Sequence, residues 1–200
     1  MIPLMKPWAA ISYDTNTYRD LTWFARGLYA SISRITPEDF LQNPSPDYRY
    51  INLVTADMAL RQDISQTLNN LELDRFSYVH PTSTVCQDVS EFGILVYPNC
   101  SIYHNVDLDQ DIIIHANSAI GHNAHIGEGT YISGGVIIGG SAHIGNYNWL
   151  GLSVTVYDKV RIADHVKLAA RSVAKNDITE SGTYGTVFTT KKLFQQYNSK

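Results

Sequence analysis

Four of the seven histidines form two pairs with the same spacing. His104 and His122 are separated by eighteen positions, and so are His125 and His143. The imidazole side chain loses its proton near neutral pH, so a histidine can serve as a general base, and its neutral form can bind a metal ion. The two pairs raise the question of which element would stack them. They also raise the question of whether the stacked rings form a catalytic site, a metal site or merely an exposed edge.

The element that would stack them is a series of aliphatic residues at every sixth position. A helix face would repeat every three or four residues, and a half-buried strand every two. A period of six is typical of hexapeptide-repeat β-helices, in which each six-residue unit forms one short side of a coil and stacks on its neighbours. The unbroken part of the series is Ile120, Ile126, Ile132, Ile138, Ile144, Leu150, Val156, Ile162 and Leu168. Glycine follows five of these residues, at Gly121, Gly127, Gly139, Gly145 and Gly151.

The solenoid is predicted to occupy the middle of the chain. The period begins at Val79 and slips by one residue around residues 91–93 before it continues. Residues 79–176 are therefore expected to form a parallel β-solenoid. They follow a small α/β domain, residues 1–78, and precede a short C-terminal tail, residues 177–200.

A coil of three six-residue sides assigns each residue to a column, because every third six returns to the same side. His104, His122 and Gly140 share one column, and His125 and His143 share another. The members of each pair are therefore expected to lie one coil apart and to point the same way.

Residues 1–78 lack the period of six and alternate between predicted strands and helices. Strands are expected at Trp8–Tyr13 and Tyr50–Val54, and amphipathic helices at residues 18–32 and 57–70. Another helix is predicted to begin at Thr36, where a threonine cap precedes a proline and two acidic residues. The pattern indicates a small unit of strands covered by helices.

The composition excludes several classes of protein. The 200 residues include 15 basic and 19 acidic side chains with no basic run, so the chain lacks the attraction to phosphate that nucleic-acid binders need. Its two cysteines, Cys86 and Cys100, are too few for a disulfide framework and form no CxxC pair. The chain has no apolar run long enough for a membrane span, and residues 1–10 do not form a signal peptide. A cytoplasmic location is expected.

A zinc site is the first functional alternative. The γ-class carbonic anhydrases use a solenoid of this type and bind zinc through three histidines, two of which are five residues apart. Here His115, His122 and His125 follow one another at gaps of seven and three, and no two histidines are five apart. Zinc needs ligands that converge at about 2.1 Å, which these spacings do not ensure. No metal is therefore expected.

Three motifs resemble those of a family of sugar acyltransferases. They are Tyr-Val-His-Pro at 78–81, Gly-Ile-Leu-Val-Tyr-Pro at 93–98, and Ile-His-Ala-Asn-Ser-Ala-Ile-Gly-His-Asn-Ala-His-Ile-Gly at 114–127. In this order, over about residues 50–177, they are similar to the hexapeptide-repeat sialic acid O-acetyltransferases and bacillosamine-pathway nucleotide-sugar N-acetyltransferases. The resemblance implies a left-handed parallel β-helix that forms a homotrimer, with acetyl-CoA in clefts between neighbouring prisms.

The resemblance also implies a catalytic role for His122. The family's catalytic histidine matches His122, which would remove a proton from a sugar hydroxyl or amine. Attack on the thioester then creates an oxyanion, which needs a fixed hydrogen-bond donor. In the relatives the backbone N–H of a glycine one coil above supplies it. That glycine corresponds to Gly140, which with Gly139 would let the cofactor approach the backbone.

Three further positions belong to the implied site. Asn123 stands where relatives often have a glutamate that orients the catalytic ring, and its amide oxygen can still accept the ring N–H. Tyr131 stands where a second histidine is frequent near the acetyl group. His104, one coil below His122, is expected to contact the acceptor.

The two ends of the chain depart from the family's pattern. Relatives hold the nucleotide of the acceptor with a glycine-rich turn after the first strand, but residues 9–18 contain no glycine. Residues 185–192 lack the family's Val-Pro-Ala-Lys turn beside the coenzyme. The acceptor is therefore open among a nucleotide sugar, a free sugar and a polysaccharide unit.

The chain is predicted to be an acetyl-CoA-dependent sugar N- or O-acetyltransferase of polysaccharide biosynthesis. The alternative is a non-catalytic β-helix that serves in assembly or binds carbohydrate. Loss of thiol release in His122→Ala would distinguish the enzyme from the binding protein.

Overall fold

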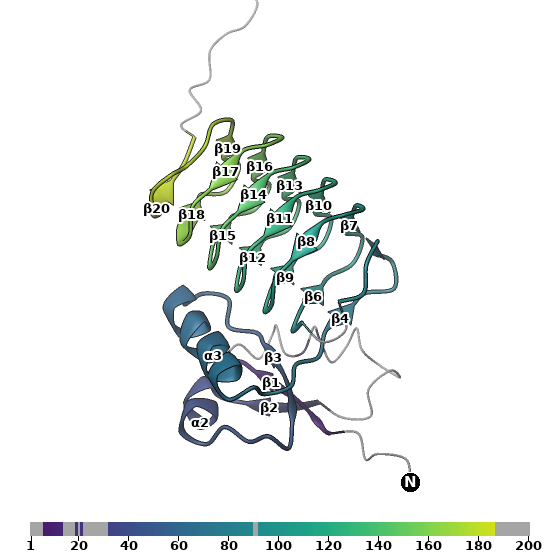
Figure 1. Cartoon of the computed structure of the whole chain (residues 1–200), viewed down its shortest axis with the longest axis vertical. Coiled ribbons are helices and arrows are strands. Elements are labelled where there is room, and N and C mark those ends of the chain that lie inside the picture. Colours follow the sequence, from purple (N-terminus) through teal and green to yellow (C-terminus); the bar gives the residue numbers. More distant parts are fainter. Residues whose placement is uncertain (1–5, 14–18, 20, 22–31, 90–91, 187–200) are drawn as a thin grey trace, which may run out of the picture.

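The computed structural model describes residues 6–13, 19, 21, 32–89 and 92–186. It shows a tall solenoid of stacked coils with a smaller α/β unit packed against one side (Figure 1). The predicted combination of a β-solenoid with a small N-terminal α/β unit is confirmed. None of the helices in the described ranges is long and apolar enough to cross a lipid bilayer.

The N-terminal unit contains a three-stranded parallel sheet in the order β2-β1-β3. The strands are β1 (Trp8–Ile11), β2 (Ile32–Ile35) and β3 (Arg49–Asn52), and the helices are α2 (Pro37–Gln42) and α3 (Met58–Asn70). The side chains of β1 and β3 are almost entirely buried, which agrees with the continuous apolar runs that predicted them.

The predicted helix starts are confirmed. The side chain of Thr36 accepts the N–H of Asp39 at the start of α2, and Asp57 accepts the N–H of Leu60 at the start of α3. The helix predicted for residues 18–32 lies almost wholly outside the described residues. Its last residue, Ile32, is the first residue of β2 instead.

The solenoid strands lie in three parallel sheets of six, four and seven strands within the described residues. Their bounds are β4 (Tyr78–Val79), β5 (Thr84–Val85), β6 (Leu95–Val96), β7 (Ser101–Ile102), β8 (Asp107–Leu108), β9 (Ile113–Ile114), β10 (Ala119–Ile120), β11 (His125–Ile126), β12 (Tyr131–Ile132), β13 (Ile137–Ile138), β14 (His143–Ile144), β15 (Trp149–Leu150), β16 (Thr155–Val156), β17 (Arg161–Ile162), β18 (Val166–Leu168), β19 (Val173–Ala174) and β20 (Gly182–Tyr184). Ile120 of β10 pairs with Ile138 of β13, and Ile126 with Ile144. These partners are three sixes apart, so the predicted coil length is confirmed.

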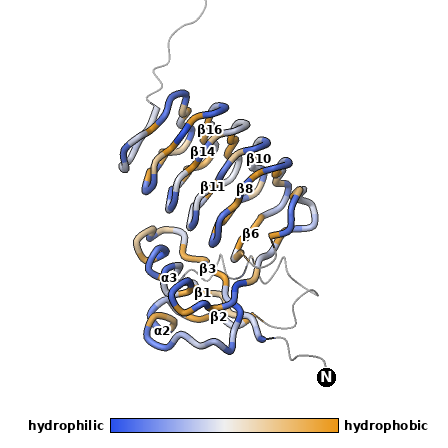
Figure 2. Tube along the Cα trace, in the orientation of Figure 1, coloured by the Kyte–Doolittle hydropathy of each residue, from blue (hydrophilic) through white to orange (hydrophobic). Residues whose placement is uncertain are grey.

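The residues at every sixth position form the solenoid core. Ile120, Ile126, Ile132, Ile138 and Ile144 are all at most 2% exposed. Hydrophobic and hydrophilic segments accordingly alternate along the coils (Figure 2). Because each buried residue contacts its counterpart on the next coil, the core is continuous along the solenoid.

The corners show a second period of six, which was not predicted from the sequence. A residue with positive φ recurs at every sixth position. These residues are Gly93, Asn99, Asn105, Asp111, Asn117, Asn123, Gly129, Gly135, Ser141, Tyr147, Ser153, Lys159, His165 and Arg171. Glycine and asparagine tolerate this left-handed conformation best. The asparagine at position 123 therefore also has a structural cause.

The two ends of the solenoid depart from the regular coil length. Tyr78 pairs with Leu95, which makes the first coil one residue shorter, as the slip predicted. Leu168 pairs with Tyr184, which makes the last coil two residues shorter. The solenoid therefore extends beyond residue 176, where the predicted tail began, because β20 continues the seven-stranded sheet after the period is lost.

Two buried arginines join the α/β unit to the solenoid. Arg61 of α3 is fully buried, and its guanidinium donates to the carbonyls of Val54 in the α/β unit and of Gly129 and Asp111 in the solenoid. Burial lowers the pKa of Arg61 to about 10, although Asp111 opposes the shift. Arg75 forms a buried ion pair with Asp111 at 3.0 Å. These contacts fix where the α/β unit sits on the coils.

Candidate active site

The predicted column is present at the corner between β10 and β11. The rings of His104 and His122 are stacked with centroids 5.6 Å apart and an interplanar angle of 9°. Both side chains are exposed. Strand pairing holds Gly140 one coil beyond His122, in the same corner position after β13. The predicted stacking is confirmed, whereas the chemical roles of these residues stay predictions.

Gly140 has no side chain at the place where the His122 ring lies. A Cβ atom added to Gly140 would lie 2.9 Å from Nε2 of His122 and 3.0 Å from its Cε1. Alanine would therefore push the ring away. The Nε2 atom of His122 thus faces bare backbone, and the ring packs closely against Gly140 because glycine has no side chain there.

The N–H of Gly140 is not free in this chain. It donates to Oδ1 of Asp158, one coil further along, at 2.8 Å. The predicted oxyanion donor is therefore occupied unless Asp158 moves. Adding one more coil to the count would have identified Asp158 as the next member of the column, but the predicted column ended at Gly140.

The side chain of Asn123 contacts the other nitrogen of the His122 ring. Nδ2 of Asn123 lies 3.0 Å from Nδ1 of His122. If Nδ2 donates, the neutral ring carries its proton on Nε2 and cannot accept one there. A 180° rotation of the amide group exchanges Nδ2 and Oδ1. Oδ1 then accepts a hydrogen bond from Nδ1–H of His122, and the Nε2 lone pair faces Gly140. Only this second arrangement suits a general base.

Tyr131 lies in a different sheet from the His122 column. It belongs to β12 of the seven-stranded sheet, and its hydroxyl is 3.0 Å from Nε2 of His115. The His115 ring is stacked on Tyr97 at 4.1 Å, and burial lowers the pKa of His115 to about 4. The structure therefore does not bring Tyr131 to His122 within one chain.

Gly139 has a packing reason for being glycine. A Cβ atom there would collide with the side chain and backbone of Asp158 on the next coil. Close packing between coils is therefore sufficient to explain this glycine, and its predicted role in cofactor binding stays a prediction.

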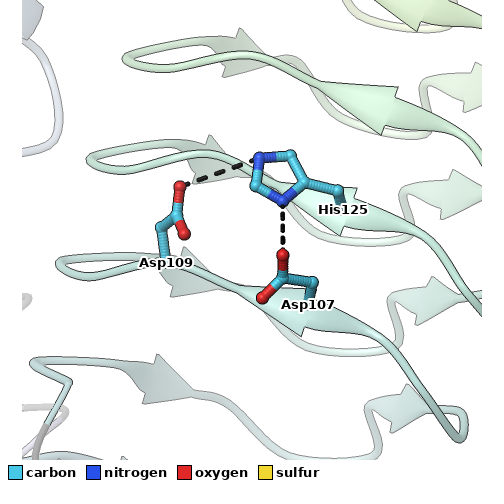
Figure 3. Close-up of side chains that lie close together, drawn as sticks. All are labelled: Asp107, Asp109 and His125. Atoms are coloured by element: carbon cyan, nitrogen blue, oxygen red, sulfur yellow. Dashed lines mark hydrogen bonds and ion pairs between the residues drawn. The ribbon is translucent and has the colours of Figure 1, made fainter.

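One histidine of the second pair, His125, has two carboxylate partners, as Figure 3 shows. His125 and His143 are stacked with centroids 4.4 Å apart. Nδ1 of His125 lies 3.0 Å from Asp107, and Nε2 lies 3.7 Å from Asp109. Neither aspartate was predicted from the sequence, although Asp107 stands one full coil before His125 in the same column.

These three side chains are the cluster in the described residues that could hold a metal ion. Their potential ligand atoms lie within 4.8 Å of one another. However, the two ring nitrogens of His125 point to different carboxylates (Figure 3). A single ion can therefore bind only one of these nitrogens, and the cluster has the geometry of an ion-pair network around one imidazole.

Known proteins resemble this chain in structure more than in sequence. No model of a known protein family matches the sequence, and no curated protein matches it. The acetyltransferase domain of PglB from Neisseria gonorrhoeae has a TM-score of 0.79 at 18% identity, over 90% of this chain and 97% of that domain. A structure of the same domain contains acetyl coenzyme A.

Two further structures have the same fold. WeeI from Acinetobacter baumannii has a TM-score of 0.63 at 12% identity, over 88% of this chain and 95% of WeeI. PerB from Caulobacter crescentus, solved with CoA and GDP-perosamine, has a TM-score of 0.57 at 14% identity, over 92% of this chain and 95% of PerB. At these identities the comparisons show a shared fold that includes the N-terminal unit.

Proposed function

We propose that this chain is an acetyltransferase that moves an acetyl group from acetyl-CoA to an amine or hydroxyl of a sugar or sugar derivative. The observation that carries the proposal is the exposed His122 ring, whose Nε2 faces the bare backbone of Gly140. The shared fold with the PglB acetyltransferase domain, which has been solved with acetyl coenzyme A, supports the choice of donor.

In the proposed reaction His122 is the general base. Oδ1 of Asn123 accepts a hydrogen bond from Nδ1–H of His122, so the lone pair on Nε2 takes a proton from the acceptor as its oxygen or nitrogen attacks the thioester carbon. The carbonyl electrons move to oxygen, and the N–H of Gly140 stabilises that oxyanion. The carbonyl then re-forms, the C–S bond breaks, and the CoA thiolate takes the proton from the imidazolium. Each proton and electron pair is accounted for without a metal.

The acceptor is proposed to lie beside His104 and the N-terminal unit. His104 is stacked one coil below His122 and is exposed, so it can bind a hydroxyl next to the reacting atom. PerB, whose structure contains GDP-perosamine, shares the N-terminal unit. A nucleotide sugar is therefore the first acceptor to test, followed by free amino sugars.

We also infer that the active form is a homotrimer with acetyl-CoA between neighbouring prisms. The sheet that contains β10 and β13 exposes the apolar side chain of Ile137, which is 52% exposed, and Leu152 at the corner before this sheet is 60% exposed. This face meets the His122 corner. A second copy packed there would bury the apolar residues and exclude water from the base, which a single exposed chain cannot do.

The test is thiol release from acetyl-CoA with a panel of nucleotide sugars and amino sugars. The wild-type protein should release thiol with at least one acceptor. His122→Ala should lower kcat by about 10²- to 10⁴-fold, which is the usual contribution of a general base. His125→Ala, which removes a histidine at the same spacing, is the matched control and should keep most of the activity.

Two results would contradict this proposal. Unchanged turnover in His122→Ala would remove His122 as the base. Absence of acetyl-CoA binding in the wild-type protein would instead favour a non-catalytic solenoid that binds carbohydrate.

A further inference from the structure

Asp158 is the fourth member of the His122 column and covers the backbone of the coil before it. Its Oδ1 atom accepts the N–H of Gly140 at 2.8 Å, and a Cβ atom on Gly139 would collide with the same oxygen. The Asp158 side chain is exposed, and no cation pairs with it within the described residues. The carboxylate is therefore held mainly by this one N–H.

The same contact occurs at the neighbouring corner. Asp164 accepts the N–H of Asn146 at 2.7 Å, and Asn146 in turn accepts the N–H of Glu128 at 2.9 Å. A side chain that accepts the N–H one coil before it is thus a general way to satisfy a corner N–H in this solenoid. In the His122 column the contact has a second consequence, because the N–H concerned belongs to the glycine that faces Nε2 of His122.

We propose that Asp158 gates acetyl-CoA binding by holding the Gly140 N–H in the free protein and releasing it to the thioester carbonyl. This inference rests on the proposed function, since the oxyanion would form at the same N–H. One N–H cannot serve a carboxylate and an oxyanion equally well. Two negative charges in contact also repel each other, and more strongly once water is excluded. Asp158 must therefore rotate away when the donor binds, and this displacement weakens the binding of acetyl-CoA.

The test compares three variants of the full-length protein. Asp158→Ala removes the competing acceptor, so it should bind acetyl-CoA about tenfold more tightly, an effect equal to about 1.4 kcal/mol. Asp158→Asn keeps an oxygen acceptor but no charge, so its affinity for acetyl-CoA should lie between those of the wild-type protein and Asp158→Ala. Asp164→Ala, which removes the same type of contact at a corner without a histidine column, should leave the affinity unchanged.

The measurements are titration calorimetry with acetyl-CoA, thermal unfolding, and the KM for acetyl-CoA. Asp158→Ala and Asp164→Ala should lower Tm by similar amounts, because each leaves one corner N–H without its acceptor. Of these two alanine variants, only Asp158→Ala should lower the Kd and the KM. A merely structural role for Asp158 would change Tm and leave the Kd alone.

The outcomes separate this inference from the proposed function. Unchanged or weaker binding in Asp158→Ala, while the wild-type protein binds acetyl-CoA and turns over, would overturn the gate and leave the proposed function standing. A wild-type protein that binds no acetyl-CoA would overturn both.

Discussion

The two histidine stacks have the same spacing and lie on the same solenoid, yet their surroundings differ. The rings of His104 and His122 are 5.6 Å apart, and Nε2 of His122 faces the bare backbone of Gly140. The rings of His125 and His143 are 4.4 Å apart, and both nitrogens of His125 have carboxylate partners. The first stack therefore has a ring nitrogen that a substrate can reach, whereas in the second stack both nitrogens of His125 are engaged by carboxylates.

The difference shows that the spacing positions a ring but does not determine its chemistry. That chemistry depends on the residue that the adjacent coil places opposite each ring nitrogen. For His122 this residue is Gly140, which presents bare backbone and no side chain to the ring. For His125 the previous coil supplies Asp107, which fills the space and offers a negative charge. A single substitution on the adjacent coil should therefore convert one environment toward the other.

The largest effect is expected from Gly140→Ala. The added methyl group would lie 2.9 Å from His122 Nε2, so the ring must move away from Gly140. A displacement of about 1 Å at a reacting centre costs about a hundredfold in rate. We expect kcat/KM to fall by about that factor with little loss of stability, because the nearest atoms to the new methyl group all belong to the exposed His122 ring.

Gly134→Ala is the matched control for this prediction. Gly134 holds the equivalent position at another corner, where an added Cβ would meet its nearest neighbours at 3.4 Å and 3.7 Å. These are ordinary contacts, so activity and thermal stability should both stay close to those of the wild-type protein. Equal loss of activity in the two variants would show that the corner glycines matter only for coil packing.

A smaller effect is expected from Asn123→Gly. Glycine suits the left-handed backbone at this position, where φ is 57°, so the corner should be preserved. The variant loses the contact between the amide and Nδ1 of His122, which is 3.0 Å long. A neutral hydrogen bond contributes about 0.5–1.5 kcal/mol, so kcat should fall about threefold to tenfold while the KM for acetyl-CoA changes little. The kinetics should be compared with those of Asn117→Gly, which has the same conformation at a corner without a catalytic candidate.

The fold was predictable because its inward-facing residues repeat without interruption. From Ile120 to Leu168 every sixth residue is aliphatic, and each residue of this series is buried in the solenoid core. The last coil was missed because β20 pairs after two residues fewer than the period requires. The helix of residues 18–32 lies mostly outside the described part of the chain; Arg19 and Leu21 are helical, and Ile32 is in β2.

The candidate site was only partly predictable. The coil count stacked His104, His122 and Gly140 correctly, but it does not say what each backbone N–H bonds to, so the contact between Gly140 and Asp158 was missed. Tyr131 was placed in the site by resemblance alone. The count already assigns it to another column, since it pairs with Trp149 of β15 in a different sheet.

The smallest effect concerns the second stack and is measured by pH titration. The pKa of His143 is lowered from its ordinary value, chiefly by burial and further by the neighbouring His125 and Arg161. In NMR titrations the midpoint of His143 should therefore lie below about 6.5, the value of a free histidine. Because the unfolded chain binds this proton more strongly than the folded one, the associated stability is present above about pH 6.5 and is lost as the pH falls below it.

Two substitutions of His125 separate the causes of this shift. His125→Phe keeps an aromatic ring over His143 and removes the charge, so it should raise the midpoint only slightly. His125→Ala also exposes His143, so it should raise the midpoint further, because burial is the largest cause of the shift. If the midpoint were the same in both variants and in the wild-type protein, the close stacking of His125 on His143 would have no electrostatic consequence. The contrast between the two stacks would then depend on the carboxylates alone.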